Sequence, residues 1–546
     1  MTRATAALGF GLALAVTAVA SACGQAATGG SVAGDASGAG RGRILLVLPF
    51  DNRSGQPSLE WIREAAPEIL SSRFLSAGFA PMSRTDRLYA LDHLGLPEGF
   101  HPSRATALKL AQTLDADSIV VGSFVTDGTG IVAEAQVVDV PHLRMSQTIT
   151  AQGEMKDLIA VFDTLAWKLT RQMDPGFSVA QETFVAAGSG MRVDAFEQYI
   201  RGITESDHDE RLRHLNQAVK LSPAFGPAWM ALGREDYNGQ QYDAAAAAFA
   251  KVSPNDPDAL EAGFYRGLSL LFSGDYPKAE QAFAGVARVL PLAEVVNDEG
   301  VAVSRQGHDG TALFRQAVAA DAHAADYHFN LAVSLNRHGN TAEALSELAQ
   351  CLRLRPNDSE AQALTADWKP PAAKQQPAAD STSPEEARPD PLERIARNFD
   401  AVAFRQAAQM LDQVDEARLA ALGPEQQAQK LALQAKDYLD KGLLLEAERL
   451  YLSAVAIDDR VASVHAGLAE VRERTGDKVN ARKEARTSLE LMPSVQAYLV
   501  MGRLDLDAGH MDAASYDVGE AEKIESGNKA VQALRQQLDA GEGQQK

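Results

Sequence analysis

The spacing of apolar positions changes once along the chain, near residue 190. In the first part, short apolar runs such as ILLVLPF and SIVVGSFV are bounded by turn residues, which is typical of buried strands. Stretches with a helical period lie between these runs, at residues 61–74, 104–114 and 155–173. The alternating run IVAEAQVVDV follows the turn TDGTG and predicts a hairpin. The pattern therefore predicts an α/β domain over residues 43–174.

Beyond residue 190, small and aromatic residues recur at a fixed distance. The distance is 34 residues, and it separates three residues of one unit from the same three of the next: Ala245, Phe249 and Pro257 from Ala279, Phe283 and Pro291. A glycine five residues before an alanine recurs in a similar way, at Gly274, Gly339, Gly442, Gly476 and Gly509. A period of this length is typical of stacked helix pairs.

The recurring residues resemble the tetratricopeptide repeat, whose W-x2-L-G, A-x3-F and final P stand here as Trp229, Leu232, Gly233, Ala245, Phe249 and Pro257. The resemblance implies right-handed solenoids of helix pairs, in which small residues allow close approach and phenylalanines fill the space between units. One unit, at residues 293–324, is about two residues short, and Gly310 stands at the place of its second-helix alanine.

The register divides the repeats into two blocks, a first solenoid at residues 190–368 and a second at residues 391–540. Between them, residues 369–390 are Pro-rich and polar, which predicts a disordered linker. The sequence LERIARNFDAVAFRQAAQMLDQV, at residues 392–414, predicts a helix that leads into the second solenoid. The expected fold is mostly α, with an α/β amino-terminal domain followed by two α-solenoid blocks.

The first 23 residues carry an apolar run that ends in small residues before Cys23, which is typical of an export signal. The letters VASAC resemble a bacterial lipoprotein cleavage box, which implies lipidation of Cys23. Plain secretion and an uncleaved anchor stay open as alternatives. Residues 24–42 are rich in Gly, Ala and Ser and predict a flexible tether. We expect an exported protein, periplasmic or anchored to the outer membrane of a bacterium.

The α/β part resembles the amino-terminal domain of the Tol translocation protein B and the curli secretion lipoprotein. The resemblance is carried by VLPFDNRSG, LDADSIVVGSF, AEAQVVDV and MKDLIAVFDTLAWKL. It implies an envelope assembly and interaction module without catalytic residues. The turn of Asp51, Asn52, Arg53 and Ser54 lies where α/β domains often bind ligands, although these residues can equally serve to build and cap the turn.

The net charge and the lack of known catalytic or metal-binding motifs limit the classes of function that fit the sequence. The net charge of -21, from 73 acidic and 52 basic residues, argues against binding to nucleic acid. The sequence has no phosphate-binding loop, nucleophile elbow, HExxH or CxxC. His208 and His214 are six residues apart, on different faces of a helix, and Cys351 fits a small buried core residue. We therefore expect no catalytic residues, no cofactor and no metal site.

In tetratricopeptide repeats the first helix of each pair faces a concave groove. The resemblance places seven residues there: Arg234, Tyr237, Phe264, Tyr265, Leu268, Asn330 and Arg337. Such a mixture of aromatic and polar side chains suits a bound peptide or helix. Alternatively, Phe264 and Leu268 pack between units and the others form a solvated face. The fifth positions are Met230, Phe264, Asn297 and Phe329, a pattern that does not support a clamp for a terminal carboxylate.

These observations favour a non-enzymatic scaffold of the cell envelope that binds protein or peptide partners through its repeat grooves. Contact with the membrane would be made through lipidated Cys23. One alternative is an oligomeric secretion-channel or envelope-assembly component, which would need an additional membrane-spanning hairpin pair. A second alternative is an enzyme with an unrecognised site, or the accessory subunit of an unidentified enzyme.

Overall fold

The computed structural model describes residues 44–99, 102–188, 190–369 and 391–544. All of them belong to one compact unit. The predicted export signal with Cys23, the tether over residues 24–42, and residues 370–390 of the predicted linker lie outside the described residues. Those three assignments therefore stay predictions.

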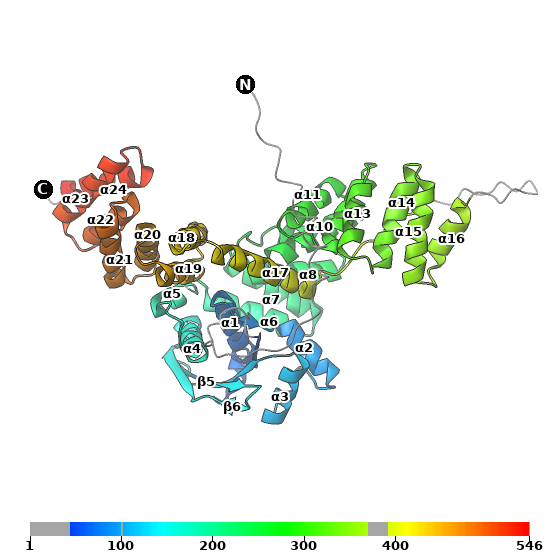
Figure 1. Cartoon of the computed structure of the whole chain (residues 1–546). Coiled ribbons are helices and arrows are strands. Elements are labelled where there is room, and N and C mark those ends of the chain that lie inside the picture. The colour runs from blue at the N-terminus through cyan, green and yellow to red at the C-terminus, as the bar shows by residue number, and fades with distance from the viewer. Residues whose placement is uncertain (1–43, 100–101, 189, 370–390, 545–546) are drawn as a thin grey trace, which may run out of the picture. The chain divides into compact units, whose positions relative to one another are not determined.

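A mixed sheet forms the centre of the amino-terminal part, in blue and cyan in Figure 1. β1 pairs in parallel with β3 and β4, whereas β5 pairs antiparallel with β4, β6 and β7. The hairpin of β4 and β5 turns at residues 127–129, within TDGTG, as the sequence predicts. The strands are β1 (Ile44–Val47), β2 (Asp51–Asn52), β3 (Ala80–Pro81), β4 (Ser118–Thr126), β5 (Gly130–Asp139), β6 (Arg144–Met145) and β7 (Ile149–Glu154).

Helices cover both faces of this sheet. Successive residues of a strand point to opposite faces, and apolar residues of β1 lie on each face and pack against helices there. Leu45 packs in one core with Phe74 of α1 and Phe162 of α4. Leu46 packs in the other core with Leu91 of α2 and with α3. The helices are α1 (Ile62–Ser76), α2 (Arg84–His93), α3 (Arg104–Thr113), α4 (Leu158–Met173) and the short α5 (Gln181–Ala186).

The sequence pattern does not predict β3 or α2. Helix α2 has the sequence RTDRLYALDH, and its buried residues are Arg87, Ala90 and Leu91. Arg87 is buried because its guanidinium forms an ion pair with Glu64 of α1. Because one of the buried residues is charged, the apolar residues of this helix recur only weakly with a helical period. The pattern of apolar positions therefore does not predict the helix.

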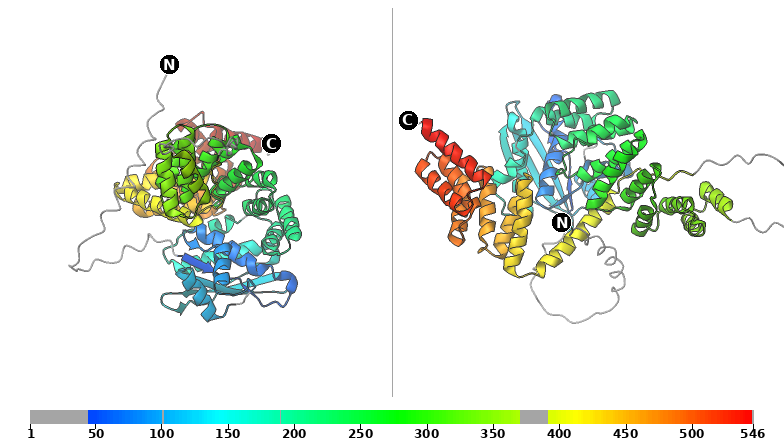
Figure 2. Two further views of the ribbon diagram at one scale, coloured as in Figure 1. Left: turned by 90° about the vertical axis from the view of Figure 1, so that its right-hand side faces the viewer. Right: turned by 90° about the horizontal axis from the view of Figure 1, so that it is seen from above.

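Helix pairs follow one another through the first solenoid, from green-cyan to yellow-green in Figures 1 and 2. Each predicted unit from residue 226 to residue 358 holds one pair of helices, and an entry pair precedes them. The helices are α6 (Val193–Thr204), α7 (His208–Leu221), α8 (Gly226–Asn238), α9 (Tyr242–Phe249), α10 (Ala259–Ser273), α11 (Tyr276–Val289), α12 (Ala293–Arg305), α13 (Thr311–Ala320), α14 (Ala325–Arg337), α15 (Thr341–Leu354) and α16 (Ser359–Trp368).

The two helices of a pair approach closely where a glycine faces a phenylalanine ring. A Cβ atom on Gly233 would lie 2.7 Å from Phe249, and one on Gly267 would lie 2.6 Å from Phe283. Both rings are buried. Any larger residue at the glycine would have to push the neighbouring helix away, which explains why the glycine recurs with the period of the repeat.

The short unit keeps this contact with a shorter second helix. Phe314 follows Gly300 by 14 residues, and a Cβ atom on Gly300 would lie 2.8 Å from its ring. Helix α13 begins at Thr311, one residue after Gly310. A Cβ atom on Gly310 would lie 2.8 Å from the carbonyl oxygen of Gly300. Gly310 therefore lets the chain enter the second helix directly against the first.

The second solenoid follows α17 (Ala401–Ala420). It consists of α18 (Pro424–Asp440), α19 (Leu444–Ile457), α20 (Ala462–Arg474), α21 (Lys478–Leu491), α22 (Val495–Asp507), α23 (Met511–Ile524) and α24 (Lys529–Gln544). The prediction of one helix over residues 392–414 is wrong in its first part, because residues 391–400 are not helical. Contacts with the first solenoid, rather than helical hydrogen bonds, hold this stretch.

Of the helices in the described part of the chain, none has both the length and the apolar character that a membrane span requires.

The close contact of Gly267 with Phe283 generates a first prediction. We expect Gly267→Ala to lower the free energy of unfolding by about 1–3 kcal/mol, because the added methyl group overpacks the contact. The matched control is Gly285→Ala on α11, where nothing lies within 4 Å of an added Cβ atom. This control should raise the free energy of unfolding by up to about 1 kcal/mol, the gain in helix propensity. Urea denaturation of the full chain, followed by circular dichroism, measures both; equal effects would contradict the packing argument.

Candidate peptide-binding groove

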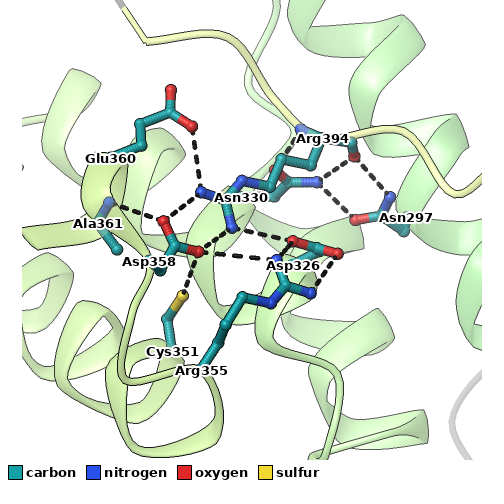
Figure 3. Close-up of polar contacts among 9 residues, drawn as sticks. All are labelled: Asn297, Asp326, Asn330, Cys351, Arg355, Asp358, Glu360, Ala361 and Arg394. Carbon is teal, nitrogen blue, oxygen red and sulfur yellow. Dashed lines mark hydrogen bonds and ion pairs between the residues drawn. The ribbon is translucent and has the colours of Figure 1, made fainter.

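Residues 391–400, PLERIARNFD, lie without helical structure against α12, α14 and the start of α16, and we call them the bound segment. Asn297 and Asn330 both donate a hydrogen bond from Nδ2 to the carbonyl oxygen of Arg394, at 3.1 and 2.7 Å. The Arg394 N–H donates in turn to Asn330 Oδ1 at 2.7 Å (Figure 3). Two asparagine side chains therefore satisfy both main-chain polar groups of one residue.

Two further amides of the bound segment are held by acidic side chains of α12. The Ala396 N–H donates to Asp298 Oδ1 at 2.9 Å, and the Asp400 N–H donates to Glu294 Oε1 at 3.0 Å. Burial raises the pKa of Asp298 well above its usual range. These bonds take the place of the internal hydrogen bonds that a helix would have provided.

The side chain of Arg394 enters an acidic pocket, drawn in Figure 3. Its guanidinium forms two parallel hydrogen bonds to Asp358, at 2.6 and 2.8 Å, and further bonds to Asp326 at 2.9 Å and Glu360 at 3.1 Å. It also lies over the ring of Phe329, 3.6 Å from the centroid. Paired bonds of this kind favour Arg over Lys, because only a guanidinium offers two donors in one plane.

The pKa of Asp358 reflects this pairing. The hydrogen bonds from Arg394 lower the pKa of Asp358 to about 2. An unpaired Asp has a pKa of about 3.9, so the attraction is complete above about pH 4 and is lost as the pH falls towards 2. Arg355 and Cys351 also face Asp358, with Arg355 3.7 Å and the Cys351 sulfur 3.9 Å from its Oδ2. Asp358 therefore keeps its charge throughout the neutral range.

Glu393, the residue before Arg394, enters a pocket of the opposite charge. Arg305 Nε lies 3.2 Å from Glu393 Oε2, and Arg337 and Ser304 both donate to Oε1. Arg337 also donates to the carbonyl oxygen of Pro391 at 2.6 Å. The Glu393 side chain is only 1 % exposed. A buried carboxylate needs such pairing, since an unpaired buried charge is strongly unfavourable.

An aromatic contact holds the carboxyl-terminal end of the bound segment. The ring of Phe399 packs on Phe264 of α10, with centroids 5.7 Å apart. Arg397 lies over the ring of Phe272, 5.5 Å from its centroid. The bound segment therefore has three anchors along its length: an acid, an arginine and an aromatic ring.

Four of the seven residues predicted for the groove contact the bound segment, namely Phe264, Tyr265, Asn330 and Arg337. Phe264 is at the same time fully buried, because its ring packs on Phe283 from the inside and on Phe399 from the groove. Leu268 is 0 % exposed and lies in the core of the solenoid. Leu268 therefore packs inside the solenoid, as in the alternative interpretation given above, and has no exposed surface for a partner.

Arg234, Tyr237 and Tyr265 lie together on α8 and α10. The rings of Tyr237 and Tyr265 contact each other, with centroids 5.6 Å apart. Arg234 forms an ion pair with Glu261 and lies 5.8 Å from the centroid of the Tyr265 ring. Burial raises the pKa of Tyr237 to about 12, so its hydroxyl group is neutral at physiological pH. Tyr265 also has a hydrogen bond with the main chain of Phe399, so it contacts the bound segment.

The acidic residues of the groove were not among the predicted ones. Asp298, Asp326 and Asp358 are indistinguishable by sequence from acidic residues of a solvated helix face. Asn297 could have been found, because it is the one polar residue among the fifth positions of the four units compared above.

In the turn after β1, the side chains of Asn52 and Ser54 form hydrogen bonds within the fold. Asn52 Oδ1 accepts a hydrogen bond from the Ser54 N–H at 3.0 Å, and Ser54 Oγ accepts one from the Thr126 N–H at 3.1 Å. The Arg53 N–H donates to the carbonyl oxygen of Phe124 at 2.9 Å. These contacts correspond to the turn-building alternative for residues 51–54.

The two histidines of α7 have different neighbours. His208 lies 3.5 Å from Glu235, and His214 lies 2.7 Å from the Gln198 Oε1. Within the described ranges, no group of three or more His, Cys, Asp or Glu side chains is arranged to hold a metal ion.

The double role of Asn330 generates a second prediction. We expect Asn330→Ala to speed amide exchange in residues 391–400 by at least about 10-fold, because the Arg394 main chain loses a donor and an acceptor. Hydrogen–deuterium exchange of the full chain, read by mass spectrometry, measures this. The control is Asn480→Ala on α21, which removes a side chain that bonds to Asp477, the residue before that helix, and it should leave this exchange unchanged. Unaltered exchange in Asn330→Ala would show that the asparagine does not hold the segment.

Comparison with known proteins bears on the repeats. A tetratricopeptide-repeat family model matches residues 212–291 and 304–359. No curated protein matches the chain. The matched stretches include Asn330, whereas Asn297 lies between them.

Several solved structures are similar to this chain over about a third of its length. YrrB, described as a TPR protein with an unusual peptide-binding site, is 17% identical, with 32% of this chain and 92% of YrrB covered and a TM-score of 0.30. MamA from Desulfovibrio magneticus RS-1 is 22% identical, with 31% and 100% covered and a TM-score of 0.29. A thermophilic TPR protein of Thermus thermophilus is 18% identical, with 32% and 98% covered and a TM-score of 0.25. The family model identifies residues 212–291 and 304–359 of this chain as tetratricopeptide repeats.

Proposed function

We propose that this protein is a non-enzymatic scaffold of the bacterial cell envelope whose first solenoid binds extended segments of partner proteins. The observation that carries the proposal is the hydrogen bonding of Asn297 and Asn330 to the main chain of Arg394. Main-chain groups are the same in every peptide, so this arrangement suits a segment of another protein as well as one of this chain. Tetratricopeptide repeats commonly serve as protein-binding scaffolds, which agrees with this role.

The charges of the groove favour a protein over a nucleic acid as partner. The Arg394 pocket contains Asp326, Asp358 and Glu360, which would repel a phosphate backbone. The whole chain carries a net charge of -21, which acts in the same direction. A peptide with a basic residue is the ligand that these carboxylates suit.

The assignment to the cell envelope rests on the sequence. The first 23 residues contain a basic residue, an apolar run and small residues in the order typical of an export signal. Cys23 stands where a lipoprotein would be lipidated. The resemblance of residues 43–174 to envelope assembly modules points to the same compartment. In this proposal Cys23 anchors the chain, the α/β domain docks on an envelope complex, and the solenoids recruit partners.

Site-specific cross-linking in living cells tests partner binding. We expect a photo-cross-linking residue in place of Tyr237, beside the groove, to trap a partner protein. The same residue in place of Val289, which is 63% exposed on α11, is the control and should not trap that protein. Capture from position 237 should fall at least about 10-fold in the double variant Asn297→Ala, Asn330→Ala, since each lost main-chain bond weakens binding. Equal capture with intact asparagines and without them would refute a role for the groove.

The proposed anchor has a separate test. Mass spectrometry of the mature protein should find Cys23 as its first residue, carrying a lipid mass, and Cys23→Ser should release the chain from the membrane fraction. A mature chain that begins at Met1 would contradict cleavage before Cys23 and leave the uncleaved anchor, and one that begins at residue 23 without lipid would leave plain secretion.

A further inference from the structure

We infer that residues 391–400 are an internal ligand that occupies the groove of the first solenoid, and that partner proteins compete for it with an extended segment of the same chemistry. This inference rests on the proposed function and specifies both its ligand and its regulation. The recognised pattern is a Glu-Arg pair followed, after four residues, by an aromatic residue, as in Glu393, Arg394 and Phe399.

The bound segment is held as a peptide ligand is held. Its amides at Arg394, Ala396 and Asp400 all donate to side chains of the first solenoid rather than to carbonyl oxygens of a neighbouring helix or strand. The same stretch reads as a helix in the sequence, and the helix begins only at residue 401. The groove thus imposes an extended form on a sequence that favours a helix, as expected when tertiary contacts outweigh local propensity.

The order of the two charges sets the specificity. Glu393 is held by Arg305 and Arg337, whereas Arg394 is held by a group of carboxylates that includes Asp358. A segment with these two charges exchanged would put like charges in contact at both pockets, which disfavours binding strongly. The groove therefore selects for the sequence Glu-Arg and against Arg-Glu.

Attachment to the same chain gives the bound segment an advantage over free peptides. A ligand tethered by a short linker has an effective concentration on the order of millimolar at its site. A partner in trans must therefore overcome the internal ligand, and its apparent affinity is reduced by the fraction of chains with an open groove. Weakening the internal ligand should raise that fraction and hence the apparent affinity.

Fluorescence anisotropy with the labelled peptide PLERIARNFD tests this inference on the full chain. We expect the variant Arg394→Ala, Phe399→Ala to bind the peptide at least about 10-fold more tightly than the unaltered chain, because its own segment no longer fills the groove. Adding Asn297→Ala and Asn330→Ala should abolish the gain. The peptide PLREIARNFD, with the two charges exchanged, should not bind.

A second variant tests the same inference in case the first one does not fold. Glu393→Lys puts a cation between Arg305 and Arg337 and should release the internal ligand without removing an apolar anchor. Circular dichroism and size-exclusion chromatography with light scattering verify that each variant folds and remains in the state of the unaltered chain.

Other outcomes overturn the inference in distinguishable ways. Equal peptide affinity for the unaltered chain and both variants would mean that residues 391–400 do not compete for the groove. Failure of the peptide to bind any variant, with partner capture from position 237 intact, would refute the Glu-Arg pattern and leave the proposed function standing. Dimers of the unaltered chain that dissociate in the variants would mean that the segment is exchanged between copies.

Discussion

A peptide group that leaves water needs hydrogen-bond partners for both its N–H and its C=O, and this requirement fixes the register of residues 391–400 on the first solenoid. Asn297 and Asn330 meet it at Arg394, and they can act together because they stand 33 residues apart, on the first helices of two successive units. The charged contacts depend on this register. A shift of the segment by one residue would carry Glu393 towards the carboxylates that now hold Arg394.

Geometry of the repeats makes this register possible in turn. Three of the helix pairs are kept close by a glycine that faces a phenylalanine ring, at Gly233, Gly267 and Gly300. The same contact is present in the unit that is two residues short, where Gly300 faces Phe314. This unit contributes α12, and side chains of α12 and α14 act together on the peptide groups of Arg394.

The sequence predicts the parts of this fold that rest on periodic packing. The distance from Ala245 to Ala279 is enough to place the helix pairs, and the apolar runs are enough to place β1, β4 and β5. Contacts between residues that are far apart in the sequence cannot be predicted from such patterns. The charged residues of PLERIARNFD fit a helix locally, and only the pockets around Arg337 and Asp358, far away in sequence, make the extended form more stable. Leu268 likewise fits a groove position by register, yet it lies in the core.

Asp400 belongs to two structures at once. Its N–H donates to Glu294 in the groove, and its carboxylate accepts the Ala403 N–H at 2.8 Å, which caps the first turn of α17. Occupancy of the groove and the start of the next helix therefore share one residue. Whatever lifts the segment out also removes one of the contacts that hold the amino-terminal end of α17. A change of ligand in the groove would therefore reach the helix that leads to the second solenoid.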